Sequence, residues 1–344
     1  MLSVEYIPML YYDAISIHFT DDDGNVHHII VDGGDINSPK YCYTDRLKGK
    51  LENIFSKGES IDLWIITHID NDHIGGLYNF INDKEFFENH CRQLKEVWMN
   101  YGGKGDYEVQ REGTIGYHGG KKLRDVLHEK CIYVKDGIKV GFTITVFDAR
   151  ITVVAPDADS YSRYIKWWNA TEFKDKMETV DGFISGGDWD YDIKFEDFDL
   201  FRYNEDKEVK NNSSIAFVFS YHNYQILFAA DSCSTILMQG LKTTGMVKDE
   251  NVKFDLVHIP HHGSNRNSSY AFLESLDCCR YVITGNGENR YKLPNKETIA
   301  RLVAVNPTGC ELYFTEMNSK LLEMFSDEDK HNLNVYNGAS FVFE

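Results

Sequence analysis

Long apolar segments are missing from this sequence, which excludes one large class of proteins. Nowhere in the 344 residues is there a run of the roughly 18 apolar residues that a membrane-spanning helix needs. The opening stretch has no basic leader, and Glu5, Pro8 and Asp13 interrupt its apolar residues. We therefore expect neither a membrane span nor a secretion signal.

Cysteine pairs of the kind that bind zinc or exchange electrons are also missing. The seven cysteines are an odd number, and no two of them are spaced as Cys-x-x-Cys. Cysteines of this number and spacing are typical of reduced, buried thiols in a reducing compartment. We expect the protein to be cytoplasmic.

Basic residues are scarce relative to acidic ones. The 36 lysines and arginines face 54 aspartates and glutamates, which leaves a formal net charge of -18. This balance argues against a basic surface that holds nucleic acid by counterion release alone. It does not exclude a nucleic-acid substrate, since bound metal ions, a local basic patch or a partner chain would supply positive charge.

The residues that are present are those of a globular protein with a large core. Hydrophobic residues make up 42% of the chain and aromatic residues 14%, so widespread disorder is excluded. Polarity alternates over 14–19 and 27–31 around the polar turn at 21–25, which predicts a β-hairpin. Later strands are followed by helical stretches, and this order indicates an α/β sandwich with mixed sheets.

The length is compatible with one large domain or two small ones. We predict a single domain over residues 1–344, with an insertion or lid at about 157–210. In that stretch, tryptophans and acidic residues replace the aliphatic residues of a core.

Three polar loops each follow an apolar strand. The first runs from His68 to His73 and holds two histidines and two aspartates within six residues; the second contains Asp231, and the third contains His261 and His262. Imidazole nitrogen and carboxylate oxygen are the ligands that hydrolytic Zn²⁺, Mn²⁺ or Fe²⁺ takes. The loops therefore predict a metal site.

The first loop, His68-x-Asp70-x-Asp72-His73 followed by Gly75-Gly76, resembles the signature of the metallo-β-lactamase-fold hydrolases. Within that superfamily the chain is most similar to the hydrolase domain of the DNA-uptake competence proteins, which carry HxDxDH and a later HHGS. Five more segments match the family and occur in its order along the chain, at 13–17, 31–34, 211–214, 227–231 and 259–264. The resemblance implies an αββα sandwich, with two mixed β-sheets flanked by helices.

The resemblance also implies ligands for two divalent ions, Zn²⁺ or Mn²⁺. His68 and Asp70 would bind one ion, and Asp72 and His73 the other. Asp231 would bridge the two ions, and Asp72 is in addition a candidate catalytic residue. Because so many of these ligands are carboxylates, the preference shifts from Zn²⁺ towards Mn²⁺, although Zn²⁺ still binds better at equal availability.

Further site residues follow from the same resemblance. His262 is the favoured remaining ligand and His261 the favoured substrate contact, with their exchange left open. Asp32 would hydrogen-bond a ligand or the backbone of the first loop from behind. Asn212 stands where most of the superfamily has a histidine, and would orient water or phosphate.

Two more segments are candidates for contact with an anionic substrate. Ser264 and Asn265 follow the histidine pair, and Arg290 lies in a later loop. That loop resembles an N-x-Y-G-H-P stretch of the competence proteins, but Leu293 takes the place of its histidine. The sequence thus lacks one candidate acid or base.

These features predict a metal-dependent phosphodiesterase, a nuclease for DNA or RNA, which would act as an effector in antiviral defence with a regulating partner protein. One alternative is a phosphoesterase for small molecules or cyclic nucleotides, which the acidic charge fits at least as well. A second alternative is a metal-stabilised interaction module within a larger complex. In that case the acidic and aromatic stretch at 157–210 would dock a basic partner.

Overall fold

The computed structural model describes the chain except for residues 102–116, 175–188, 248–251, 290, 328 and 330. The described chain divides into two compact units, each built around one mixed β-sheet. Unit 1 takes Met1–Ile138, Ala158–Ile184 and Phe341–Glu344, and unit 2 takes Lys139–Asp157 and Ser185–Ser340. Among the described helices, none combines the length and the apolar character that crossing a bilayer requires.

The sheet of unit 1 has the strand order β15-β1-β2-β3-β4-β5-β6. Its strands are β1 (Leu2–Tyr6), β2 (Ala14–Thr20), β3 (Val26–Asp32), β4 (Ile61–Ile66), β5 (Val97–Met99), β6 (Val134–Lys135) and β15 (Ala339–Phe343). The pairs β1–β2 and β2–β3 are antiparallel, and the pairs from β3 to β6 are parallel. The predicted hairpin is confirmed as β2 and β3, with Ala14 opposite Asp32.

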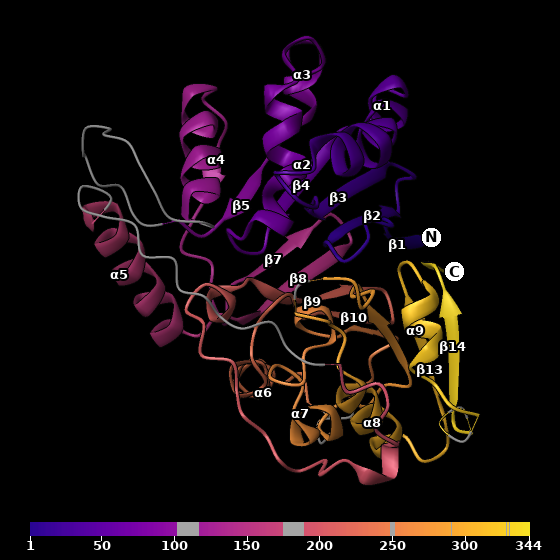
Figure 1. Cartoon of the computed structure of the whole chain (residues 1–344). Helices are drawn as coiled ribbons and strands as arrows, with labels where there is room; N and C mark the ends of the chain where they lie inside the picture. The colour runs from indigo at the N-terminus through magenta and orange to yellow at the C-terminus, as the bar shows by residue number, and fades with distance from the viewer. Residues whose placement is uncertain (102–116, 175–188, 248–251, 290, 328, 330) are drawn as a thin grey trace. The chain divides into compact units, whose positions relative to one another are not determined.

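Helices accompany this sheet (Figure 1). They are α1 (Lys48–Ser56), α2 (Asn71–Asn82), α3 (Lys84–His90), α4 (Tyr117–Glu129) and α5 (Ala158–Lys174). Helix α2 packs on β3, β4 and α4. It buries Ile74, Leu77 and Ile81, which are three and four residues apart and therefore share one face of the helix. This packing fixes the first turn of α2 next to the ends of β3 and β4.

The sheet of unit 2 has the strand order β14-β13-β12-β11-β10-β9-β8-β7. Its strands are β7 (Thr143–Val146), β8 (Ala149–Ala155), β9 (Ala216–Tyr221), β10 (Tyr224–Phe228), β11 (Leu256–His258), β12 (Arg280–Ile283), β13 (Cys310–Phe314) and β14 (Leu333–Asn337). Pairs from β7 to β10 are antiparallel, and those from β10 to β14 are parallel.

The helices of unit 2 are α6 (Ser234–Thr243), α7 (Tyr270–Glu274), α8 (Lys296–Val305) and α9 (Ser319–Glu323). Helix α6 lies on β8, and a Cβ atom at Gly240 would come within 1.7 Å of the Val154 carbonyl oxygen. A side chain at that position would therefore separate helix from sheet. The predicted α/β fold, with two mixed sheets flanked by helices, is confirmed.

The parallel part of each sheet places the polar loops. In unit 1, Val31 of β3 is in register with Ile65 of β4, and in unit 2, Phe228 of β10 is in register with His258 of β11. Neighbouring parallel strands end at the same edge of a sheet, where α/β proteins bind their ligands. Asp32 and His68 thus come together in unit 1, as do Asp231 and the histidine pair in unit 2.

The stretch predicted as an insertion is divided between the two units. Helix α5 belongs to unit 1, where the Tyr164 hydroxyl donates to the Asn100 carbonyl (3.0 Å) and Arg124 pairs with Glu172 (3.1 Å). Residues 189–210 belong to unit 2. The part at 175–188 lies outside the described residues. The single domain with an insertion stays a prediction.

Candidate metal centre

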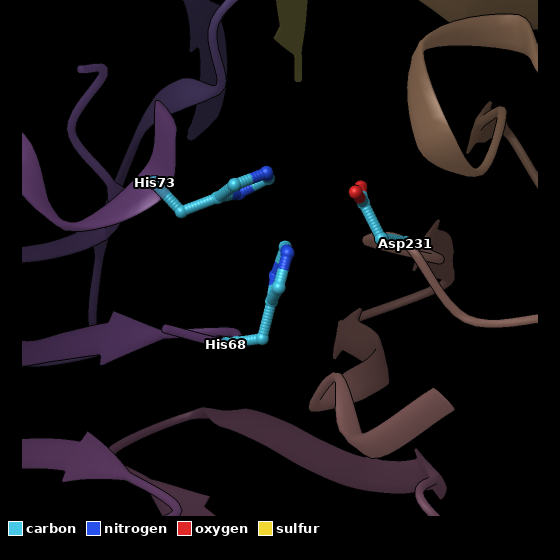
Figure 2. Close-up of side chains that lie close together, drawn as sticks. All are labelled: His68, His73 and Asp231. Carbon is cyan, nitrogen blue, oxygen red and sulfur yellow. The ribbon is translucent and has the colours of Figure 1, made fainter. Parts of the chain in front are cut away.

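Two histidines and two aspartates of unit 1 gather where β4 meets α2. His68 follows β4, and His73 lies in the first turn of α2; both are buried, with ring centroids 4.0 Å apart (Figure 2). The Nε2 atom of His68 lies 3.9 Å from Oδ2 of Asp70, and that of His73 lies 3.7 Å from Oδ2 of Asp72. Each imidazole therefore has a half-exposed carboxylate at its Nε2 side.

Asp32 holds both histidines from the opposite side. Its carboxylate accepts hydrogen bonds from the Thr67 amide (2.8 Å), the Thr67 hydroxyl (2.7 Å) and His73 Nδ1 (2.8 Å). Because the Thr67 hydroxyl donates to Asp32, it accepts from Nδ1 of His68 (3.2 Å). The network thus assigns the proton to Nδ1 of both rings and leaves Nε2 as the nitrogen able to coordinate a metal ion.

The surroundings of Asp32 favour a cation. Burial raises the pKa of Asp32 to about 6, although His73 and the Thr67 amide oppose the rise. The carboxylate of Asp13 is also near, since ligand atoms of Asp13, Asp32 and His73 lie within 4.8 Å of one another. Two buried carboxylates this close repel each other when both are ionised, and a bound cation would relieve that repulsion.

Glycines set the distance between Asp32 and α2. A Cβ atom at Gly33 would lie 2.6 Å from the Cα atom of Gly76, and one at Gly75 would lie 2.4 Å from the backbone carbon of Asp35. The loop after β3 therefore lies directly against the first turn of α2. This close packing explains why glycines stand in the Asp-Gly-Gly and Gly-Gly segments of the sequence. A side chain at Gly33 or Gly75 would push Asp32 away from His73.

The corresponding loops of unit 2 contain an unusual backbone. Asp231 follows β10, and Figure 2 shows its carboxylate on that loop. The residue before it, Ala230, has φ 47°, and the consecutive His261 and His262 have φ 49° and 54°. Non-glycine residues in this left-handed region cost of order 1–3 kcal/mol each and gather at functional sites. A hydrogen bond from His261 N to Ala230 O (2.9 Å) joins the two loops.

His261 and His262 of unit 2 are also held through Nδ1. His262 Nδ1 contacts the Thr284 hydroxyl at 2.9 Å, and His261 Nδ1 lies 3.0 Å from the Asn267 amide oxygen. Because an amide oxygen only accepts, the proton of His261 lies on Nδ1. The Nε2 atom of His261 lies 3.6 Å from Oδ2 of Asp231.

Asp206 supports His261 and was not predicted from the sequence. Its carboxylate lies 3.5 Å from His261 Nδ1 and accepts hydrogen bonds from Asn211 Nδ2 (2.7 Å), Asn267 Nδ2 (3.3 Å) and the Glu208 amide (3.0 Å). Burial raises the pKa of the Asp206 carboxyl, but its contact with His261 and these hydrogen bonds outweigh burial and hold the pKa well below its usual range.

The charge of Asp206 acts on His261 in turn. Burial lowers the pKa of His261, but the carboxylates of Asp231 and Asp206 raise it more, and the net shift is upward. In the sequence, Asp206 stands in the charged run 205–208, which is typical of an exposed loop. Only the contact with the distant Asn267 and His261 distinguishes it from its neighbours, so the sequence carries no signal for its position.

Two further predicted residues are buried near this network. The side-chain amide of Asn212 donates to the Asp206 carbonyl oxygen (3.0 Å). The Ser264 hydroxyl accepts a hydrogen bond from the Arg266 amide (3.2 Å). Both side chains thus help to shape the loops, and their catalytic and substrate roles stay predictions.

Asn265 and Arg290 complete the predicted set. The Asn265 side-chain amide donates to Glu297 (2.6 Å), and its carbonyl accepts from Arg301 (2.9 Å), so this residue is tied to α8. Arg290 lies outside the described residues. Substrate binding by either residue stays a prediction.

Several solved structures resemble this chain at low similarity. A diphosphatase from the PhnP family has a TM-score of 0.40 and 12% identity, covering 100% of this chain and 98% of its own. The long form of RNase Z from yeast has a TM-score of 0.40 and 12% identity, covering 93% of this chain but 37% of its own. A Cronobacter sakazakii metallo-β-lactamase has a TM-score of 0.32 and 10% identity, with 86% of each chain covered.

None of the curated proteins matches the sequence significantly. The family profile described as "Metallo-beta-lactamase superfamily", by contrast, matches residues 24–274. That range is more than half of the chain, and it contains all of the histidines and aspartates described above except Asp13. The chain belongs to the metallo-β-lactamase superfamily.

Proposed function

We propose that this protein is a metal-dependent phosphodiesterase that cleaves nucleic acid. One observation carries the proposal: four histidines, in the loops after parallel strands or in the first turn of α2, each have Nδ1 held by a side-chain oxygen. The pairs are His73 with Asp32, His68 with Thr67, His262 with Thr284 and His261 with Asn267. A hydrogen bond to Nδ1 fixes the ring and directs Nε2 to a metal ion or a substrate.

The donor set suits two divalent ions. The residues that would hold them are His68, Asp70, Asp72, His73, Asp231 and His262. Bound as a pair, such ions lower the pKa of water from 15.7 to roughly 7 and stabilise negative charge on the oxygens around phosphorus. Three carboxylates among six ligands make Mn²⁺ a candidate beside Zn²⁺, the ion that the Irving–Williams order favours.

The chain's own residues orient the reactants. Asp32 keeps His73 and, through Thr67, His68 in one tautomer. Asn267 accepts from Nδ1 of His261 and so fixes the ring, whose Nε2 lies 3.6 Å from Oδ2 of Asp231 and would contact a substrate oxygen. The fit to phosphodiesters, rather than to lactones or β-lactams, rests on the HxDxDH and HHGS segments that resemble the competence proteins. Regulation by a partner protein and a role in antiviral defence stay predictions from the sequence.

The test combines metal analysis with hydrolysis. We expect about two metal equivalents per chain, and hydrolysis of bis(p-nitrophenyl) phosphate and linear DNA with Mn²⁺ or Zn²⁺. The double variant Asp72→Ala/His73→Ala should lose metal and about 100-fold or more in activity. His27→Ala is the matched control, because His27 is a buried histidine of the same sheet that pairs with Asp21 and Asp62 instead.

Full activity in the Asp72→Ala/His73→Ala variant would refute the site. Cleavage of small esters and dinucleotides without cleavage of DNA would favour the alternative of a small-molecule phosphoesterase, which the net charge of -18 also suits. A protein that binds no metal would leave the interaction module as the remaining reading.

A further inference from the structure

Trp189 of unit 2 is an exposed tryptophan with two lysines against its ring. Its side chain is 46% exposed, and its indole N–H donates to the Gly287 carbonyl (3.3 Å). The ammonium groups of Lys292 and Lys320 lie 4.2 and 4.9 Å from the ring centroid. In a protein with a net charge of -18, two ammonium groups at one aromatic ring form a local basic patch.

Asn289 holds described residues on the far side of the loop that carries Lys292. Asn289 Oδ1 accepts from the amides of Tyr291 and Leu293 (3.0 Å each), and Asn289 Nδ2 donates to the Leu293 carbonyl (2.9 Å). Lys292 itself has φ 57°, a conformation that a lysine adopts rarely. These contacts present Tyr291, which is 45% exposed, and Lys292 at the tip of the loop.

This loop rests directly on the histidine turn. A Cβ atom at Gly285 would lie 2.4 Å from the His262 carbonyl oxygen, and one at Gly263 would lie 2.5 Å from Pro294 Cβ. The Asn295 amide also donates to the Gly263 carbonyl (3.1 Å). The segment that follows Lys292 therefore packs directly on the histidine turn within unit 2.

We infer that Trp189, Lys292 and Lys320 form a binding subsite for single-stranded nucleic acid, in which the indole stacks on a base and the two ammonium groups bind the flanking phosphates. An exposed aromatic ring with basic side chains beside it is the combination by which proteins bind single strands without sequence preference. The inference rests on the proposed function, because the strand bound here would continue into the phosphodiesterase site.

Two acidic residues, Glu323 and Asp190, are compatible with this role. Glu323 pairs with Lys320 at 3.3 Å, but both side chains are exposed, so water screens the pair and a phosphate replaces it readily. Asp190, next to the indole in sequence, accepts from the amides of Lys296 and Glu297 and is thereby committed to the start of α8. Each lysine contact with the ring is an exposed cation–π contact, which stacking on a base exceeds in strength.

Binding is measured first, on metal-free protein, so that the result is independent of catalysis. The probe is a short oligothymidylate, titrated while tryptophan fluorescence is recorded in the presence of EDTA. We expect quenching in the wild type, and an affinity reduced at least about tenfold in Trp189→Ala, with Trp189→Phe in between, because phenylalanine still stacks. Fluorescence anisotropy of a labelled strand gives the affinity of the variants that lack Trp189.

The lysines are tested by salt dependence. Lys292→Gln and Lys320→Gln should each reduce the slope of log K against log salt concentration by about 0.7, the value for one phosphate contact on a single strand. Phe201→Ala is the matched control, since Phe201 is a 75% exposed aromatic residue of the same unit that packs on Tyr270. This control should bind the strand like the wild type.

Hydrolysis then separates the subsite from the proposed function. In Trp189→Ala, kcat/KM for an oligonucleotide relative to that for bis(p-nitrophenyl) phosphate should fall about tenfold, chiefly through KM. Wild-type affinity and salt slope in the three variants, or no binding by the wild type, would refute the subsite. An oligonucleotide that binds at Trp189 but is never cleaved with any metal would leave the subsite in place and overturn the phosphodiesterase.

Discussion

The two units hold their candidate site histidines, His68 and His73 in unit 1 and His261 and His262 in unit 2, by different means. In unit 1 a single carboxylate, Asp32, serves both rings, one directly and one through Thr67. In unit 2 each ring has its own partner: Thr284 holds His262, while Asn267 and Asp206 hold His261. Unit 1 thus concentrates its support in one side chain, and unit 2 distributes it.

The difference extends to the backbone. Unit 1 places its candidate ligands by close packing of glycines between the loop after β3 and the start of α2. Unit 2 places them by a strained turn with two successive left-handed histidines, which hydrogen bonds keep in place. We therefore expect unit 1 to respond to the loss of one carboxylate or one glycine, and His261 of unit 2 to tolerate the loss of either of its two supports.

The largest effect is expected from Asp32→Ala. This change removes the acceptor for His73 and Thr67 together, so the imidazoles of His73 and His68 lose their orientation. Metal affinity, measured by competition with a chromogenic chelator, should fall by about 10–100-fold. Asp62→Ala is the control, since Asp62 also holds a buried histidine of this sheet, His27 (3.2 Å). Equal metal affinities of the two variants would contradict the role of Asp32.

The next effect concerns the glycine packing in unit 1. Gly75→Ala places a methyl group 2.4 Å from the backbone of Asp35, which must shift, at a cost of about 1–3 kcal/mol. Gly49→Ala in α1 meets nothing within 4 Å, and should gain about 0.5–1 kcal/mol because alanine favours a helix. Urea unfolding measures both, and a Gly75→Ala protein as stable as Gly49→Ala would show that the contact is loose.

Much of the fold was predictable because its signals are local. The apolar run at 61–66 matches β4 residue for residue, and the turn at 21–25 separates β2 from β3 as expected. The amphipathic pattern over 45–57 predicts a helix, whereas in the structure a π-helical segment at Lys40–Leu47 already precedes α1. Residues 40–47 show no clear apolar periodicity, so the sequence does not reveal this earlier start.

The candidate site was predictable where its residues are contiguous. His68, Asp70, Asp72 and His73 stand within six residues, so their chemistry is visible in the sequence. Asp206 and Asn267 are separated by 60 residues and meet only after folding, at 3.3 Å. Their contribution to His261 depends on tertiary contacts that no local pattern encodes.

A smaller effect is expected from Asp206→Asn. Asn267 still holds Nδ1 of His261 in this variant, so we expect kcat to fall only about tenfold, the value of one hydrogen bond to a charged group, with the metal content unchanged. Asp255→Asn is the control, because the Asp255 carboxylate accepts from the Gln225 amide (2.9 Å), away from the histidines. A loss of metal in Asp206→Asn would show that its role is to hold the fold of the loops rather than His261.

The smallest expected effect is a pH dependence of stability that comes from one histidine of unit 1, His18. His18 of β2 has a lowered pKa, first because it is half-buried and then because His28 and Lys57 lie near it, whereas Glu5 and Glu59 oppose the shift. Its protonation therefore disfavours the folded state, and the free energy of unfolding should decrease as the pH falls below about 6.5. His18→Gln removes this contribution, so its stability relative to the wild type should be constant above that pH and should grow below it. Urea unfolding between about pH 5 and 8 measures this difference, and parallel curves for the two proteins would contradict the assignment to His18.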